Sequence, residues 1–392
     1  MQRSEKRPGS QSALRDRNRT RIVDALVDNG PSTQAELSRR TGLSAATVSN
    51  IVRRMLDEHS VTATETTSSG RRATSIRLRD DGSAVVGLDF GRRHARVVVV
   101  TPGYRVLAEE TIELPLGYPA LEGVSATRDV LDRLLAASDL DRSNVLGAGL
   151  GMPGPIDRRT GMVLQGTMLP EWIGVTTTDL ERVLELEVLL DNDANLGALA
   201  EVTWGDYAGV EDLVFLKIGT GIGSGLILGG RPYYGHFGVT GEIGHTTVDE
   251  RGAVCRCGKR GCLETVASTT VMLDLLFPRD PREHGTADIV RGALDGDAGT
   301  LRVLQDAGAA IGTVLGNTAN LVNPEVILIG GPLAETGPAL LEPVVRSFAR
   351  HAVPYVAEAT MIAISSLGDR AEALGAASLA LRELAADAAA RS

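Results

Sequence analysis

The sequence predicts an α/β body of two lobes with a cleft between them, preceded by a small winged helix-turn-helix domain. Two glycine-linked β-hairpin patterns, at residues 84–100 and 213–229, lie far apart in the chain and suggest a duplicated core. Aromatic residues make up only 3% of the 392 residues, which favours an α/β core over an aromatic-rich β-sandwich. Residues 15–80 instead show short helix patterns followed by two strand patterns.

The net charge of -10 is distributed unevenly along the chain. Residues 1–80 carry 15 Lys or Arg against 9 Asp or Glu, whereas residues 81–392 carry 25 against 41. A basic segment joined to an acidic body suggests that one part meets a polyanion, although a solvated basic face would have the same charge. Residues 1–10 are polar and no apolar run approaches the ~20 residues that span a bilayer, so we expect a cytoplasmic protein with no membrane partner.

The basic segment contains the pattern of a helix-turn-helix. Residues 21–27 have helical periodicity, and Thr33 then precedes Glu36 by the three positions of a capping box that begins a second helix. Gly42 ends that helix, and Ser44 caps a third helix. The apolar stripe of this third helix comprises Val48, Ile51, Val52, Met55 and Leu56. Two short helices joined by a glycine-centred turn predict a helix-turn-helix.

Two strand patterns, at residues 61–64 and 74–78, follow the third helix and flank a basic loop at 68–72. This arrangement predicts a wing, with Arg71 and Arg72 placed for contact with phosphates or the minor groove of double-stranded operator DNA. The third helix would present small and hydrogen-bonding side chains to base edges in the major groove: Ser44, Thr47, Ser49, Asn50 and Arg53. A three-helix protein-docking module is the alternative. Residues 1–14 are expected to form a disordered arm and residues 15–80 the DNA-binding domain.

Three polar clusters follow apolar strand patterns in the body, which is where α/β sheets bind ligands. They are GLGMPGPID at 149–157, DNDAN at 191–195 and GGP at 330–332. The second hairpin has a glycine-rich turn, of the kind whose backbone amides approach a phosphate. Ordinary turns have a similar composition, but the joint occurrence of these segments predicts a ligand-binding cleft.

All three cysteines lie in the segment CRCGKRGC at 255–262, and a histidine stands ten residues before the first of them. Three thiolates and one imidazole are the ligand set of a closed tetrahedral zinc site: His245, Cys255, Cys257 and Cys262. Three reduced core cysteines beside a chance histidine would have the same composition, but the two glycines supply the tight turn that a metal knuckle needs. A closed four-ligand site leaves no position for an activated water, which argues against a zinc-dependent hydrolase.

Taken together, these motifs resemble those of the ROK family of repressors and sugar kinases. The resemblance covers essentially the whole chain and rests on Asp89-Phe90-Gly91, GLGMPGPID, DNDAN, IGTGIGSG, GEIGH and CRCGKRGCLE. It implies an actin-like ATPase (ribonuclease H-like) fold with structural zinc. It also implies that sugar hydroxyls meet Asn192, Asp193, Glu242, His245 and Glu264. His245 would then hold zinc with one ring nitrogen and face the sugar with the other.

In kinases of this family, the residue that matches Asp193 is the general base. The phosphate-binding positions correspond here to Asp89, Gly91, Gly219, Thr220, Gly221 and Gly223. The first phosphate loop of the kinases reads Asp-x-Gly-Gly-Thr-Lys, whereas this chain has Arg92 and Arg93 in that loop. These bulky side chains would occupy space that phosphates need, although arginine also binds phosphate. ATP and Mg²⁺ are therefore expected only if kinase activity survives this change.

The sequence thus favours a sugar-responsive transcriptional regulator, most simply a repressor of carbohydrate genes. The alternative is an ATP-dependent hexose kinase with a DNA-binding appendage. We expect a first lobe at 84–191, completed by a C-terminal helix at 376–392, and a second lobe with the zinc site at 192–375. The effector would be a sugar or sugar phosphate, with glucose, N-acetylglucosamine, mannose and xylose equally compatible. Because one winged helix reads one half-site, a homodimer or homotetramer is expected.

Overall fold

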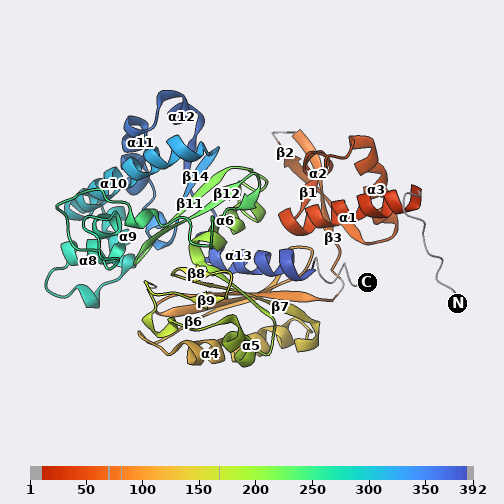
Figure 1. The fold of residues 1–392 in the computed structure, drawn as a ribbon, viewed down its shortest axis with the longest axis horizontal. Helices are drawn as coiled ribbons and strands as arrows, with labels where there is room; N and C mark the ends of the chain where they lie inside the picture. Colours follow the sequence, from red (N-terminus) through yellow and green to blue (C-terminus); the bar gives the residue numbers. More distant parts are fainter. Residues whose placement is uncertain (1–10, 69–70, 81, 167, 386–392) are drawn as a thin grey trace.

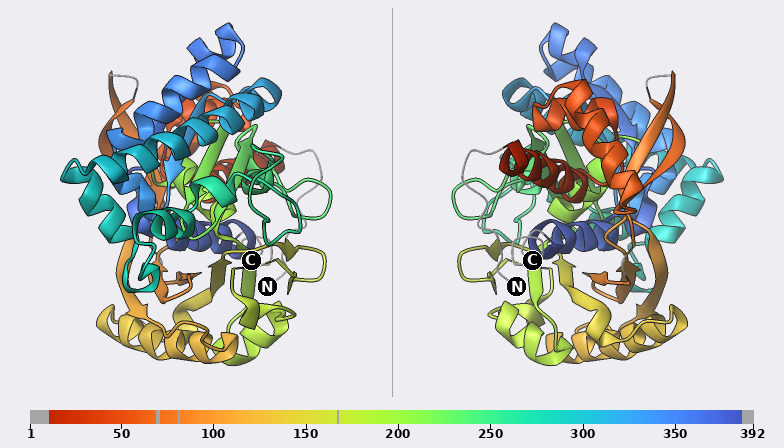
Figure 2. Two further views of the ribbon diagram at one scale, coloured as in Figure 1. Left: turned by 90° about the vertical axis from the view of Figure 1, so that its left-hand side faces the viewer. Right: turned by 90° about the vertical axis from the view of Figure 1, so that its right-hand side faces the viewer.

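The computed structural model describes residues 11–68, 71–80, 82–166 and 168–385. Over these residues it shows a small N-terminal domain beside a body in which two five-stranded sheets lie on either side of helix α13 (Ala371–Ala380) (Figure 1). Figure 2 shows the same body from two further sides, with the C-terminal helix crossing between the lobes. In these ranges no helix is both long and apolar enough to cross a membrane.

The N-terminal domain has the predicted winged helix-turn-helix architecture. Its elements are α1 (Gln11–Asn29), β1 (Ser32–Thr33), α2 (Gln34–Thr41), α3 (Ala45–Asp57), β2 (Val61–Ser68) and β3 (Arg71–Leu78). Thr33 and Glu36 close the predicted capping box, Gly42 ends α2 with a φ of 65°, and Ser44 caps α3. The apolar stripe of α3 faces inward, and its most buried members are Val48, Val52 and Met55.

Two features of this domain differ from expectation. Residues 11–14 form the first turn of α1 rather than part of a disordered arm, because 11–29 contains neither the glycine nor the proline that would interrupt a helix. The remainder of the predicted arm, 1–10, lies outside the described residues. Arg71 and Arg72 belong to β3 rather than to a loop, since the antiparallel pairing extends to Ser68 opposite Arg71.

The first sheet of the body has the strand order β10-β7-β4-β5-β6. Its strands are β4 (Ala84–Phe90), β5 (His94–Val100), β6 (Val106–Glu113), β7 (Val145–Met152) and β10 (Val188–Asn192). Strands β4, β7 and β10 are parallel, and β5 and β6 extend the sheet as an antiparallel meander. Helices α4 (Ala120–Ala137) and α5 (Thr177–Leu184) pack beside it, and a short hairpin of β8 (Ile156–Asp157) and β9 (Met162–Val163) follows β7.

The second sheet has the order β13-β12-β11-β14-β15 and repeats the central hairpin pattern. Its strands are β11 (Leu213–Ile218), β12 (Ile222–Leu228), β13 (Arg231–Pro232), β14 (Val326–Gly330) and β15 (Met361–Ile364). The helices of this lobe are α7 (Glu264–Ala267), α8 (Thr269–Leu276), α9 (Thr286–Leu294), α10 (Ala298–Val322), α11 (Pro338–His351) and α12 (Pro354–Ala359). The two hairpins predicted from sequence therefore lie at the centres of two separate sheets, as a duplicated fold requires.

Helices α6 (Asp193–Thr203) and α13 join the two lobes. Their backbones approach closely, because a β-carbon on Gly375 would lie 1.8 Å from the carbonyl oxygen of Leu196. Helix α13 begins at Ala371, five residues before the C-terminal helix that we predicted. The lobe boundary that we placed at residues 191 and 192 remains a prediction, since α6 contacts strands of both sheets.

The N-terminal domain is docked against the body through Tyr104, which lies in the turn between β5 and β6. The Tyr104 hydroxyl donates to the carbonyl of Val27 at the end of α1. The Tyr104 ring lies 5.3 Å from that of Trp204, and the Trp204 indole donates to Ser378 in α13 at 2.8 Å. A continuous series of contacts therefore connects the N-terminal domain with the helix between the lobes.

Glu201 in α6 is fully buried between the lobes. One carboxylate oxygen accepts a hydrogen bond from Ser365, and the other has no partner among the residues that the structure describes. Burial raises the pKa of Glu201 from 4.5 to about 7. The folded chain therefore holds a proton that the unfolded chain releases over this pH range.

We expect the stability of the protein to fall as pH rises from about 4.5 to about 7, by at most about 3 kcal/mol from this group, because the raised pKa favours the protonated folded form. Glu201→Gln should remove this contribution, whereas Glu358→Gln, at an exposed position in α12, should keep it. Melting temperatures measured between pH 5 and 8 check this. An identical pH profile for wild type and Glu201→Gln would contradict it.

Candidate ligand-binding cleft, metal cluster and DNA-binding face

A cavity of about 290 Å³ lies between the two lobes, near the lower end of the usual size range of small-molecule sites. The first lobe contributes the turn 91–94 and the loop 153–155, and the second contributes the β11–β12 hairpin and the segment 240–242. Pro332, after β14, closes one side. The polar clusters that the sequence predicted at three strand ends therefore meet at one cavity.

Asn192 and Asp193 lie where β10 becomes α6, and both line the cavity. The side-chain oxygen of Asn192 accepts hydrogen bonds from the amides of Ala194 and Asn195, so Asn192 caps the helix. Its nitrogen donates to the carbonyl of Gly154 at 3.0 Å. One amide hydrogen of Asn192 is left for a ligand, and this residue also fixes the loop beside the cavity.

Glu242 lines the cavity, but His245 and Glu264 are not among the residues that line it. The carboxylate of Glu264 is buried and bound by Arg256, whose Nε and Nη2 lie 2.9 and 3.2 Å from its two oxygens. Arg256 does line the cavity and also donates to the carbonyl of Gly166 in the first lobe at 2.7 Å. The cavity therefore presents Arg256 where the sequence predicted Glu264.

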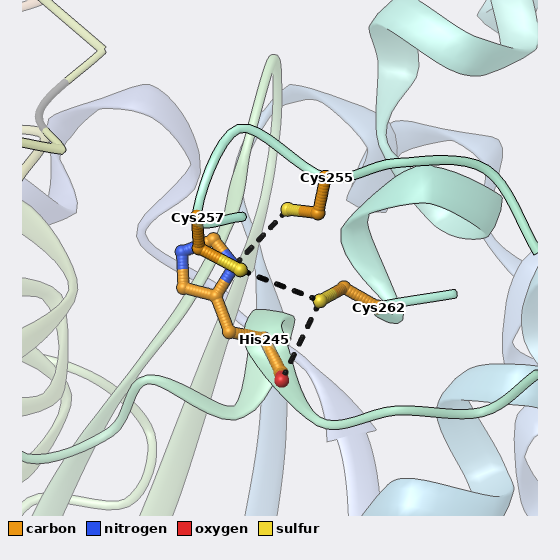
Figure 3. A group of neighbouring side chains, drawn as sticks. All are labelled: His245, Cys255, Cys257 and Cys262. Carbon is orange, nitrogen blue, oxygen red and sulfur yellow. Dashed lines mark hydrogen bonds between the residues drawn. The ribbon is translucent and has the colours of Figure 1, made fainter. Parts of the chain in front are cut away.

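The four predicted metal ligands form a cluster in which all ligand atoms lie within 4.8 Å of one another (Figure 3). The thiols of Cys257 and Cys262 are 3.6 Å apart, and the Cys255 thiol lies 3.4 Å from His245 Nδ1. These separations suit a tetrahedral ion with sulfur ligands at about 2.3 Å, which holds neighbouring sulfurs about 3.8 Å apart. Gly261 makes the required turn at a φ of 60°, where a β-carbon would meet the carbonyl oxygen of Asp249 at 1.5 Å.

The other ring nitrogen of His245, Nε2, lies 3.6 Å from Glu242 Oε2. A carboxylate at this position orients an imidazole ligand and fixes its tautomer. Because Glu242 lines the cavity, the cysteine cluster is connected to the cavity through His245 and Glu242. His245 thus turns Nδ1 toward the Cys255 thiol and Nε2 toward Glu242, and the expectation that Nε2 meets a sugar remains a prediction.

Lys217 in β11 reaches from the second lobe into a cluster of carboxylates at the base of the cavity. Its Nζ lies 2.8 Å from Asp193 Oδ2 and 3.0 Å from Glu372 Oε1, at the start of α13. Burial alone would lower the pKa of Lys217, but the charges of Asp193, Glu372 and Asp89 outweigh it and raise the pKa well above its ordinary value. Lys217 is therefore a permanent cation in the cleft.

The first phosphate loop is a tight turn in which Asp89 and Gly91 are covered by His94. The His94 Nε2 lies 3.5 Å from Asp89 Oδ2. Burial would raise the pKa of Asp89, but Lys217 and the hydrogen bond from His94 lower it. That same hydrogen bond raises the pKa of His94 against the effect of burial. The second loop, comprising Gly219, Thr220, Gly221 and Gly223, lines the opposite wall of the cavity.

On the recognition helix α3, Asn50 and Arg53 are exposed, whereas Thr47 and Ser49 are half-buried. Ser44 is exposed, but its oxygen accepts from the Thr47 amide at 3.2 Å and is therefore engaged in capping. Arg72 is exposed on β3, and the side chain of Arg71 lies outside the described part of the chain. Asn50, Arg53 and Arg72 are therefore the most available of the predicted DNA contacts.

Sequence reasoning did not identify Lys217, Arg256, Glu372 or His94 as residues of the cleft. A signal was present for Lys217, because it follows four apolar residues in LVFLKIG and interrupts a buried strand. Glu372 gave no local signal, since it is 155 positions away from Lys217 and meets it only through the docking of α13.

The fold and site define a class of protein in which a two-lobed, cleft-bearing α/β body is joined to a winged helix-turn-helix. Residues 85–383 match the ROK family, and residues 15–59 match a winged helix-turn-helix DNA-binding domain. The chain belongs to the ROK family.

Similarity to individual proteins extends over both parts of the chain. This chain is 28% identical to a putative xylose repressor of Caldicellulosiruptor sp. (strain Rt8B.4), over 96% of its own length and 98% of that protein. It is 34% identical to a glucokinase of Halalkalibacterium halodurans, over 74% of this chain and 92% of that protein. The crystal structure of a ROK family transcriptional regulator described as a homologue of the E. coli MLC protein superposes with a TM-score of 0.71 at 27% identity, covering 95% of this chain and 97% of that one.

Proposed function

We propose that this protein is a sugar-responsive transcriptional repressor of carbohydrate genes, acting in the cytoplasm on double-stranded operator DNA as a homo-oligomer. The observation that carries the proposal is the docking of a winged helix-turn-helix domain onto a ROK body, with a ligand-sized cavity between the lobes. Similarity to the putative xylose repressor over nearly the whole length of both chains supports it. The glucokinase matches only 74% of this chain.

In this proposal, the sugar hydroxyls bind Asn192, Asp193 and Glu242, with His245 and Glu264 supporting the pocket from behind. The four-residue cluster holds a structural zinc ion, because three thiolates and one imidazole are ligands that zinc prefers. When bound, the ion fixes the loop that carries Glu242, and it supplies no catalytic chemistry since all four positions are taken by protein.

A series of contacts between the cleft and the DNA-binding domain supports control of DNA binding by sugar. Asp191, next to the cleft residue Asn192, binds Arg158 at 2.6 Å, and the Arg158 guanidinium lies 3.7 Å from the centre of the Tyr234 ring. Tyr234 in turn lines a cavity of about 680 Å³ between the body and the DNA-binding domain, with Arg39 of helix α2. A sugar that favours closure of the lobes would change these contacts and, with them, the placement of the recognition helix.

The alternative, an ATP-dependent hexose kinase, is favoured by the intact second phosphate loop and by the similarity to a glucokinase. It is opposed by the ion pair of Asp193 with Lys217, since a general base must be free to accept a proton from the sugar. Arg92 and Arg93 also line the space that nucleotide phosphates would need.

One set of measurements separates these functions. The full chain is used to select sequences from a random duplex DNA library, and operator affinity is then measured with and without glucose, xylose, mannose and N-acetylglucosamine. We expect sequence-selective binding that one sugar changes by about 5–150-fold, which corresponds to the usual coupling of ~1–3 kcal/mol. Coupled ATP turnover with the same sugars should be absent. Binding without sequence preference, or sugar-dependent ATP turnover, would reject the repressor assignment.

A further inference from the structure

The kinases of this fold use a divalent cation and a nucleotide, and the residues of this cleft do not fit that pair. The carboxylate just before the first phosphate loop, Asp89, lies 3.5 Å from His94 Nε2, and the charge of Lys217 helps to lower its pKa. Arg92 and Arg93 add two further positive charges to the wall of the cavity. In the described ranges, neither arginine side chain makes a hydrogen bond or an ion pair with the protein, and Arg93 is exposed to solvent.

We propose that Lys217 takes the place of a divalent cation, neutralising the carboxylates at the junction of the two lobes so that the cleft binds its sugar without a metal–nucleotide complex. This inference deepens the proposed function, on which it rests. Lys217 comes from β11 of the second lobe, Asp89 from β4 of the first, and Glu372 from the helix between them. One ammonium group on β11 therefore pairs with carboxylates of α6 and α13, and its charge also helps to lower the pKa of Asp89 in β4.

The residue type suits this role. The chain has 3 lysines against 37 arginines, so a lysine at a buried position is unusual for this sequence. A lysine ammonium is a compact charge with three donors, which can point at carboxylates on different sides, whereas a guanidinium is planar and suits one carboxylate at a time. Lys217 uses this geometry to pair with Asp193 and Glu372 at 2.8 and 3.0 Å.

The same arrangement explains why a divalent cation is excluded. Mg²⁺ needs carboxylate and water oxygens in octahedral positions, and these carboxylates are engaged by Lys217 and His94. A second cation beside a buried ammonium would also be repelled, with little solvent to screen it. One atom, Asp89 Oδ1, is buried without a hydrogen-bond partner in the described part of the chain. Without Lys217, this oxygen and the freed carboxylates would offer ligands to a metal.

The experiment compares the wild type with Lys217→Met, which keeps the length of the side chain and removes its charge. Binding of Mn²⁺ alone and of Mg²⁺ with ADP is measured by calorimetry, and melting temperatures are recorded with and without each metal. Arg302→Met removes one charge from an exposed position in α10 and serves as the control. We expect the zinc-loaded wild type and control to bind neither Mn²⁺ nor Mg²⁺–ADP over the concentrations tested. Lys217→Met should melt lower, bind Mn²⁺ at least about tenfold more tightly, and recover stability with metal.

Equal Mn²⁺ binding by the wild type and Lys217→Met, including no binding by either, would overturn the inference. Micromolar binding of Mg²⁺–ADP by the wild type would overturn it without any variant, which covers the case in which Lys217→Met does not fold. These outcomes leave the proposed function unaffected. A protein that binds its operator, responds to sugar and also binds Mg²⁺–ADP would contradict only the role of Lys217, whereas loss of sequence-selective DNA binding would contradict the proposed function.

Discussion

Replacing Cys257 with serine is expected to release zinc, lower the melting temperature and weaken sugar binding together. Cys257 is the exposed member of the cluster, so its substitution removes a metal ligand without opening a cavity in the core. Loss of the ion would free the loop that carries Glu242, because His245 connects the cluster to that carboxylate. We expect a loss of about 3 kcal/mol in stability, which lowers the melting temperature by roughly 5 °C for a body of about 300 residues.

Zinc content, thermal melting and sugar calorimetry on the same preparations check this expectation. Lys259→Ser, at an exposed position in the same loop that supplies no metal ligand, is the matched control and should retain all three properties. If Cys257→Ser lost its zinc but kept the wild-type melting temperature and sugar affinity, the ion would have no part in supporting the pocket.

The second large effect is expected at the DNA-binding face. Asn50→Ala on the recognition helix should weaken operator binding by ~1–3 kcal/mol, or roughly 5–150-fold, and relax the sequence preference at the bases that it reads. Arg72→Ala on the wing should weaken operator and random DNA about equally and reduce the slope of log affinity against log salt by roughly one unit, because it removes one phosphate contact. Both residues are exposed in the structure.

Salt titrations of binding to operator and random duplexes measure both effects. Arg346→Ala removes one exposed positive charge from helix α11 of the body and controls for the change in net charge. A full-length Asn50→Ala variant with wild-type operator affinity and preference would mean that α3 is not the reading helix. An unchanged salt slope for Arg72→Ala would show that β3 does not contact the phosphates.

The sequence was most informative where function depends on neighbours in the chain. The capping box of Thr33 and Glu36, the apolar stripe of α3 and the cysteine cluster were predictable because helix periodicity and ligand spacing are local properties. The two sheets followed from repeated hairpin patterns. The predicted strand boundaries of the wing were less accurate, because Ser68 and Arg72 have turn-like neighbours and yet belong to paired strands.

The charge arrangement in the cleft depended on contacts between distant segments and was not predictable. The carboxylate of Glu264 is paired with Arg256, although the family motif alone suggests that this carboxylate is free to bind sugar. Lys217 meets Glu372 only when α13 docks between the lobes. Asn192 also has a structural role, because its side-chain oxygen caps α6 and its side-chain nitrogen donates to the carbonyl of Gly154. These pairings are set by tertiary packing, and a single sequence carries no signal for them.

The central claim is that sugar bound at Asp193 changes the affinity of the docked DNA-binding domain for its operator. The most direct test is a titration of operator affinity against the effective sugar, for the wild type and for Asp193→Asn. The substitution keeps the shape of the side chain and removes the charge that would accept a strong hydrogen bond from a sugar hydroxyl, while Glu372 still pairs with Lys217. We predict equal operator affinity without sugar, a change of about 5–150-fold with sugar for the wild type, and a reduced change for Asp193→Asn. An identical sugar response in the two proteins would contradict the account.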